Sequence, residues 1–319
     1  MRRRDFISLL GAVAVLCATR SRAQQPSKTY LIGVLTAQIP SLIKALKDGL
    51  RKLGYIEGQN LKVEYRFVTS GGASAEMLAC YRAGEPWSRY HYHYRYVDDD
   101  RSKASDHDDP YRNGARSGCD SRGFARPGGK VTGTMLYGTE LAGKRIDVFK
   151  AAVPAIARIA VLGTRSQLTQ LLWPQTQTAA GPLGLEARLF TVQDREELSA
   201  TFDAIAQHNA NSLFVLPDPL FYSARQMIIA LAAKHRLPAV YEDREYVLDG
   251  GLISYGPNIA EMTRRSAAFV DKILKGAKPG DLPIEAPTEY ELVINLKTAN
   301  TLGLSIPEKL LIVADEVIE

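Results

Sequence analysis

Short apolar runs alternate with stretches of helical periodicity along the chain from Tyr30 onward. The run YLIGVL, which begins at Tyr30, predicts a buried strand. The segment SLIKALKDGLRKLGY follows it with leucines at helical spacing on one face, which predicts a helix that ends at Gly54. LKVEYRF then alternates with period two and predicts a second strand. This strand–helix–strand order predicts a right-handed parallel crossover.

The same alternation recurs more clearly from residue 158 onward. Apolar runs predict strands in RIAVLG, LEARLFTV, SLFVLPD, LPAVYE and GLISYG. Helices are predicted between them at about 167–180, 196–206 and 224–235. Strands and helices that alternate at this spacing predict an open, mostly parallel α/β sheet.

Polar residues follow the predicted carboxyl ends of these strands. Ligands of open parallel sheets bind beyond those ends, so hydroxyl, carboxylate and phenol groups there are candidate ligand contacts. A structural role explains each of them equally well; Asp218, for example, is a favoured residue for capping the next helix. The candidates are Thr36, Ala37, Gly163, Thr164, Asp218, Tyr241, Glu242 and Tyr255.

Residues 1–23 have the pattern of a secretory signal peptide. A basic start precedes an apolar run from Phe6 to Ala18, and small residues at Ser21 and Ala23 predict cleavage after Ala23. The run is shorter than the roughly 20 residues that span a bilayer. We predict export to the periplasm. RRDFI also resembles the twin-arginine export motif, which would make the twin-arginine route an alternative path of export. A buried N-terminal helix is the alternative interpretation.

Length, charge and motifs exclude several classes of protein. A chain of 319 residues predicts about two domains. The net charge of +5 is spread along the chain without a basic stripe, so no nucleic-acid partner is predicted. No G-x-S-x-G, H-E-x-x-H or P-loop motif occurs, so we predict no catalytic residue and no cofactor. Cys80 and Cys119, which remain after the signal is removed, could form one disulfide.

The strand–helix pattern disappears between Cys80 and Phe124. The stretch RYHYHYRYVDDDRSKASDHDD, which begins at Arg89, contains three of the chain's five histidines. His91 and His93 would share one face of a strand, so a metal-binding loop is one interpretation. The stretch lacks a framework that would orient such ligands, and no further ligands converge elsewhere. We therefore predict no metal site.

A shifted reading frame is the second interpretation of this stretch. Tyr codons are TAY and His codons are CAY, where Y is T or C, so a Tyr–His junction read one base forward encodes Ile or Thr. Such a β-branched run favours a strand. A consistent codon choice for residues 88–112 gives RGITITTGTSTTTAAKQATTTIPIV. We hypothesise that about 81–124 is a frame-shifted translation of a strand–helix unit, and we expect this segment to be disordered or irregular.

Several long segments match a known family. They are RRRDFISLLGA, GLRKLGYIEGQNLKVEYRF, ARPGGKVTGT, LPAVYEDREYVLDGGLISYG and APTEYELVINLKTANTLGLSIPEKLL with the later ADEVIE. The chain resembles the ABC-transporter substrate-binding proteins related to tryptophan/tyrosine uptake proteins. The resemblance implies a two-lobed type I periplasmic binding protein, in which each lobe is a mostly parallel sheet flanked by helices. It also implies chain crossings near Tyr137, Tyr255 and Pro287. Lobe I would then comprise 24–137 plus 256–287, and lobe II 138–255 plus 288–319.

The function implied by the resemblance is capture of a small polar solute between the lobes. The protein would be a monomeric, periplasmic component of an ABC importer that presents its ligand to an inner-membrane permease, and would not be an enzyme. Asp218 or Glu242 could receive an amino group, backbone N–H groups at Thr164 a carboxylate, and Tyr241 could stack on an aromatic ligand. The altered segment would impair lobe I.

Three other functions compete with solute capture for an importer. A periplasmic ligand sensor and a His-rich metal-uptake protein are the alternatives. An enzyme on the same fold would need a nucleophile–base pair at the strand ends, and the sequence shows none.

Overall fold

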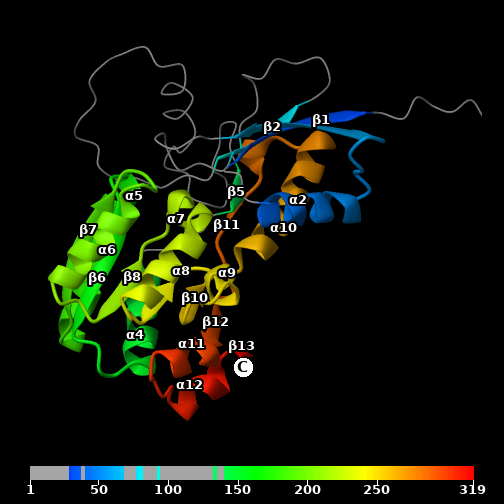
Figure 1. The fold of residues 1–319 in the computed structure, drawn as a ribbon. Helices are drawn as coiled ribbons and strands as arrows, with labels where there is room; N and C mark the ends of the chain where they lie inside the picture. Colours follow the sequence, from blue (N-terminus) through cyan, green and yellow to red (C-terminus); the bar gives the residue numbers. More distant parts are fainter. Residues whose placement is uncertain (1–28, 37–39, 68–76, 82–91, 94–131, 135–139) are drawn as a thin grey trace, which may run out of the picture.

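The computed structural model describes residues 29–36, 40–67, 77–81, 92–93, 132–134 and 140–319. Those residues form a large sheet of seven strands, a small sheet of four strands and a two-stranded sheet between them, with helices packed on the two larger sheets (Figure 1). The predicted signal peptide, Ala37, Tyr137, Cys119 and most of 81–124 lie outside the described residues.

The large sheet has seven strands in the order β13-β12-β10-β9-β8-β6-β7. The five successive strands from β10 to β7 are parallel, β12 runs antiparallel to β10, and β13 is parallel to β12. The strands are β6 (Arg158–Thr164), β7 (Glu186–Val192), β8 (Ser212–Val215), β9 (Ala239–Tyr241), β10 (Ile253–Gly256), β12 (Glu291–Asn295) and β13 (Glu316–Ile318).

Helices cover both faces of the large sheet. Alternate residues of β6 belong to different apolar clusters, because Ala160 and Leu162 pack on one face and Ile159 and Val161 on the other. A strand buried on both faces has the continuous apolar run seen in RIAVLG. The helices are α4 (Glu140–Ala152), α5 (Gln167–Ala180), η1 (Gly181–Leu183), α6 (Leu198–Gln207), α7 (Pro219–Ser223), α8 (Arg225–Lys234), α9 (Arg244–Leu248), α11 (Leu296–Thr301) and α12 (Glu308–Val313). The predicted order of strands and helices from residue 158 is confirmed.

The small sheet has the order β2-β1-β3-β4. Its core joins Ile32 and Leu50 to Phe269 and Val270, so residues far apart in sequence meet under this sheet. The elements are β1 (Tyr30–Thr36), α2 (Pro40–Lys52), β2 (Leu61–Phe67), β3 (Met77–Tyr81), β4 (Tyr92–His93), α10 (Ile259–Leu274) and η2 (Pro279–Asp281). Strands β1 and β2 are parallel, as predicted from the strand–helix–strand order.

Strand β3 departs from the predicted pattern, because it pairs with β1 antiparallel. Residues 68–76 alone connect it to β2, and a parallel connection needs a crossover of about a dozen residues or more. Strand β4 extends the sheet, again antiparallel. Tyr81 and Tyr92–His93 therefore lie in strands, which corrects the expectation that all of 81–124 is irregular.

The chain passes between the two sheets after β5 (Gly133–Thr134), after β10 and after β11 (Ile284–Glu285). Strands β5 and β11 pair in parallel beside α10, and the Thr132 hydroxyl lies 3.0 Å from the carbonyl oxygens of Leu282 and Pro283. These contacts bring the β5 and β11 segments together between the sheets (Figure 1).

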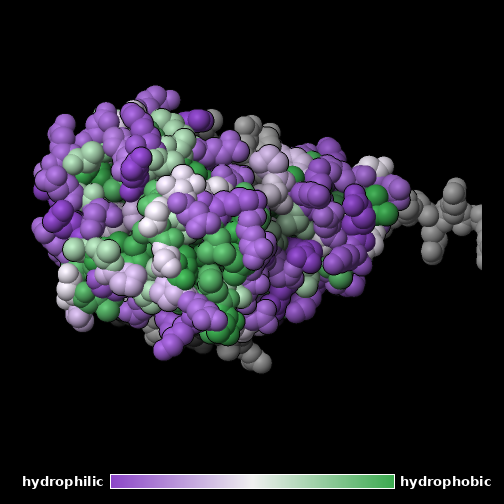
Figure 2. Space-filling view, turned by 60° about the horizontal axis from the view of Figure 1, so that its bottom comes forward, coloured by the Kyte–Doolittle hydropathy of each residue, from purple (hydrophilic) through white to green (hydrophobic). Residues whose placement is uncertain are grey.

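The end of the molecule that carries α11 and α12 shows hydrophobic areas at its surface (Figure 2). On α12, the side chains of Ile312 and Val313 are exposed.

Candidate functional site

The carboxyl edge of the large sheet brings two of the predicted site residues together. Thr164 is the last residue of β6, and Asp218 follows β8; both side chains are buried. Thr164 Oγ1 donates a hydrogen bond to Asp218 Oδ2 at 2.6 Å, and Ser166 Oγ lies 2.8 Å from Thr164 Oγ1. The parallel arrangement of β6 and β8 therefore places a hydroxyl and a carboxylate at one edge.

Asp218 is also the N-cap of α7. Its Oδ1 accepts the backbone N–H of Leu220 at 2.8 Å, so the capping interpretation of this residue is confirmed. Burial raises the pKa of the Asp218 carboxyl, while hydrogen bonds from Thr164, Leu220 and Ser166 partly offset that effect. A carboxylate has about four acceptor positions, so this one can accept a further donor.

Two other predicted contacts at this edge have structural partners. The Thr164 N–H, predicted as a contact for a ligand carboxylate, donates to Thr169 Oγ1 at 3.0 Å in this structure. A Cβ at Gly163 would lie 2.7 Å from Thr169 Cγ2. Gly163 therefore allows α5 to begin close against β6.

Tyr241 is part of the core. Its ring stacks on that of Tyr246 with centroids 4.6 Å apart, and a Cβ at Gly251 would lie 2.6 Å from its Cε2. The side chain is 1% exposed, and burial raises its pKa. In this structure Tyr241 therefore packs against Tyr246 in the core.

Glu242 and Tyr255 lie where β9 and β10 end. The Glu242 side chain is buried, and a Cβ at Gly256 would lie 1.8 Å from the Glu242 carbonyl oxygen, so the two backbones are in close contact. The Tyr255 ring stacks on Tyr290 with centroids 6.1 Å apart, and the Tyr255 carbonyl accepts a hydrogen bond from Arg145 Nε at 2.8 Å. Burial is the main cause that raises the pKa of Tyr255.

One of the predicted ligand contacts, Thr36, lies in the small sheet. Thr36 is the last residue of β1. Its side chain and the whole of Ala37 lie outside the described residues.

The sequence carries no signal for the contact between α2 and α7. The Tyr222 hydroxyl is hydrogen-bonded to the Ser41 side chain, and Leu42 is buried in the same apolar cluster as Phe221. The first turn of α2, which belongs to the small sheet, thus packs beside the edge that carries Asp218. The leucine periodicity of α2 indicated that Leu42 is buried, but no signal identified its partner.

Asp243 was also not identified from the sequence. It is 2% exposed and caps α9 by accepting the Glu245 N–H at 2.8 Å. Burial, which is the largest cause, raises the pKa of its carboxyl to about 7, and the charges of Glu245 and Glu291 act in the same direction.

The described part of the chain has neither a metal-binding cluster nor a membrane-spanning helix. No group of three or more His, Cys, Asp or Glu side chains there could hold a metal ion. The side chains of His91 and His93 lie outside that part. None of the described helices combines the length and the apolar character needed to cross a membrane.

The arrangement of sheets and helices identifies the class of protein. Two sheets flanked by helices, joined by several passages of the chain and carrying polar groups at a carboxyl edge, are the architecture of a two-lobed type I periplasmic binding protein. Residues 121–318, more than half of the chain, match the family model of the ABC transporter substrate binding protein. The chain belongs to this family, whose members bind solutes and are not catalysts.

Similar proteins span most of the chain. The tyrosine-binding protein of Clostridioides difficile (strain R20291) is 21% identical over 279 residues, which are 83% of this chain and 78% of that protein. The structure of an ABC domain from Streptococcus pneumonia in complex with L-Trp has a TM-score of 0.70 and 22% identity, and the match covers 92% of this chain and 100% of that one. A conserved domain protein from Vibrio cholerae has a TM-score of 0.68 and 21% identity, with 91% and 100% covered.

The family match begins at residue 121, near the end of the anomalous segment 81–124. This start is compatible with a reading frame that is restored before Ala125.

Proposed function

We propose that this protein is the periplasmic solute-binding component of an ABC importer and that its ligand is an amino acid with an aromatic side chain. It would act as a monomer, be exported with the segment 1–23 as its signal, and deliver its ligand to an inner-membrane ABC permease. The two lobes would be 24–137 plus 256–287 and 138–255 plus 288–319.

The observation that carries the proposal is the Asp218 carboxylate at the carboxyl edge of the large sheet. It keeps an acceptor position after its bonds to Thr164, Leu220 and Ser166, and an α-ammonium group is a charged donor suited to it. The tyrosine-binding relative and the structure with L-Trp support an aromatic ligand.

The contact between Ser41 and Tyr222 brings the helix α2 of the small sheet to this edge. It joins the first turn of α2 to α7, directly after Asp218 in the chain. Closure of two lobes around a solute excludes water, so a few hydrogen bonds and one charge fix a zwitterionic ligand.

Calorimetric titration of the full mature chain with L-tyrosine, L-tryptophan, L-leucine and D-tagatose tests this function. We expect saturable binding of an aromatic amino acid, and a loss of about tenfold or more in affinity for Asp218→Asn, because a charged donor then meets a neutral amide. Asp147→Asn removes the same charge at an exposed position of α4 and should leave the affinity unchanged.

The proposal is contradicted if no amino acid binds to either of two proteins. One is the mature chain, and the other is a version in which residues 88–112 carry the shifted-frame sequence. Binding that is unchanged by Asp218→Asn would reject this residue as the ammonium contact.

A further inference from the structure

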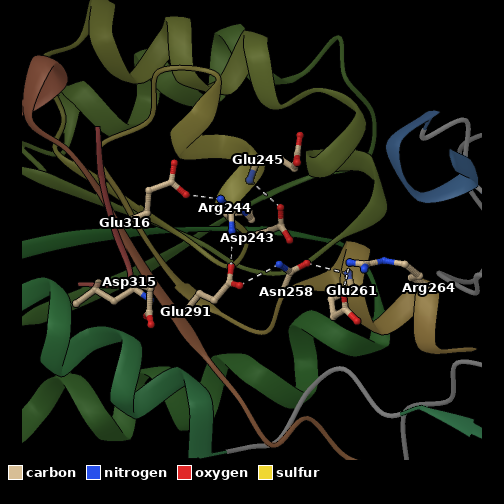
Figure 3. Close-up of polar contacts among 10 residues, drawn as sticks. Asp243, Arg244, Glu245, Asn258, Glu261, Arg264, Glu291, Asp315 and Glu316 are labelled. Atoms are coloured by element: carbon tan, nitrogen blue, oxygen red, sulfur yellow. Dashed lines mark hydrogen bonds and ion pairs between the residues drawn. The ribbon is translucent and has the colours of Figure 1, made fainter. Parts of the chain in front are cut away.

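A polar network occupies the place where the chain passes between the sheets (Figure 3). At its centre is Glu291, the first residue of β12. Its Oε2 accepts a hydrogen bond from Arg244 Nη1 at 3.0 Å, and its Oε1 accepts one from Asn258 Nδ2 at 2.9 Å. Each carboxylate oxygen thus binds a residue from a different element.

Arg244 extends this network to the edge of the large sheet. Its Nη2 also donates to the Glu316 carboxylate of β13, so one guanidinium joins α9 to both β12 and β13. The side chains of Arg244 and Glu291 are 27% and 26% exposed. Charges sheltered to this extent are screened less by salt than fully exposed pairs.

Asn258 extends the network in the opposite direction, to α10. Its Oδ1 accepts the Glu261 N–H at 2.8 Å and so caps the helix that packs on α2 in the small sheet's core. The carboxylate of Asp243 accepts a second N–H of the first turn, that of Ile259. The start of α10 is therefore bound to residues that belong to the large sheet and its helices.

The two passages that carry these residues lie side by side. Gly256 of β10 is paired with Glu291 of β12 at the last position of their antiparallel ladder. Just beside that position the rings of Tyr255 and Tyr290 stack. Rotation of α10 relative to the large sheet would have to alter the distance between Asn258 and Glu291.

We propose that Glu291 sets the hinge of this protein: by binding Asn258 and Arg244 at once, it holds α10 in one orientation relative to the large sheet and so fixes the ratio of open to closed molecules. The inference rests on the two-lobed action proposed above. Hinges of this kind consist of a few residues at element ends, and the apparent affinity for a ligand falls with the fraction of competent molecules.

The test measures lobe separation without any ligand. Spin labels on Lys52→Cys, at the end of α2, and Lys297→Cys, on α11, report the distance between the sheets in the full mature chain, with Cys80 and Cys119 replaced by serine; both labelled positions are exposed. Glu291→Gln removes the charge that binds Arg244. Asn258→Asp keeps a favoured cap for α10 but places a carboxylate opposite Glu291.

We expect both variants to shift the distance distribution and to change the ratio of the longer-separation population to the shorter by about threefold or more. Glu289→Gln, which is two residues away and exposed, is the matched control and should reproduce the parent distribution. A parent-like distribution in both variants overturns the inference, even when the unfolding midpoint has fallen, because a purely structural role would lower only stability. A shifted distribution in a protein that binds no amino acid would retain the hinge and reject the proposed ligand.

Discussion

The large and small sheets start from the same strand–helix–strand unit but are completed in different ways. In the large sheet, five strands in succession are parallel, and helices form the four connections between them along the chain. In the small sheet, β1 pairs in parallel with β2 and antiparallel with β3. Where the chain offers no crossover of sufficient length, an added strand can pair only in the antiparallel direction.

The cores of the two regions differ in the same way. Apolar clusters lie on both faces of the large sheet, and apart from Leu42 of α2 their buried residues come from the stretch 146–306. The cluster of the small sheet depends on α10, which follows α2 by some 200 residues and packs against it. The small sheet thus depends on a helix that is formed by a late part of the chain.

The largest change in stability is expected when the hypothesised strand–helix unit is restored to the small sheet. Replacing residues 88–112 with RGITITTGTSTTTAAKQATTTIPIV should raise the free energy of unfolding by about 5 kcal/mol or more, because a strand and a helix gain apolar surface to bury. Urea titration followed by circular dichroism should also show a larger m-value. A shuffled version of the inserted sequence is the control, and an unchanged m-value would reject the frame-shift hypothesis, as would codons that block the shifted translation.

One core substitution in each region tests whether the large and small sheets unfold separately. Phe214→Ala opens a cavity in the core of the large sheet and should cost about 3–5 kcal/mol. Leu50→Ala, in the small sheet's core, should leave the transition reported by Trp173 of α5 within about 0.5 kcal/mol of its parent value. Trp87 is replaced by Phe in all variants so that one tryptophan reports. Equal shifts of the Trp173 transition would show that the regions unfold as one unit.

The buried carboxyl of Asp243, which lies where the two regions join, should make the stability of the protein depend on pH. The pKa of the Asp243 carboxyl rises from 3.8 to about 7 on folding, so the folded protein holds this proton more tightly than the unfolded chain. The contribution of Asp243 to stability therefore falls as pH rises from about 4 to about 7, by up to a few kcal/mol. Asp243→Asn should flatten this part of the profile in urea titrations, while Asp281→Asn, at an exposed position, should not. The same slope in both variants would assign the pH dependence to other groups.

The smallest effect is expected for an exposed ion pair on α10. Lys275 Nζ lies 2.8 Å from Asp271 Oδ1, but the lysine side chain is 67% exposed. Lys275→Gln should change the free energy of unfolding by less than about 0.5 kcal/mol, whereas Phe269→Ala on the same helix should cost about 3–5 kcal/mol. Comparable losses would mean that α10 is held to the small sheet by its charges and not by its apolar face.

Much of the large sheet was predictable because its signals are local. The run RIAVLG is buried on both faces as β6, and the helix predicted at 167–180 is α5, which Ser166 caps. The direction of β3 was not predictable in this way, since it depends on the length of a connection.

The candidate site was predictable in part. Thr164 and Asp218 were placed at one edge because parallel strands end together. Tyr241 ends a strand of three residues, which is too short for an alternating pattern to show that its ring faces Tyr246. Contacts such as Ser41 with Tyr222, and Arg244 with Glu291, join distant segments and leave no periodic trace in the sequence.

The tight approach of Gly256 to the Glu242 carbonyl has a mechanical consequence. Because even a methyl group has no room at this point, the departing chain cannot slide toward β9 without a steric clash. In any movement of the small sheet relative to the large one, we therefore expect α10 to rotate about Gly256, so that the small sheet tilts or twists and is not translated.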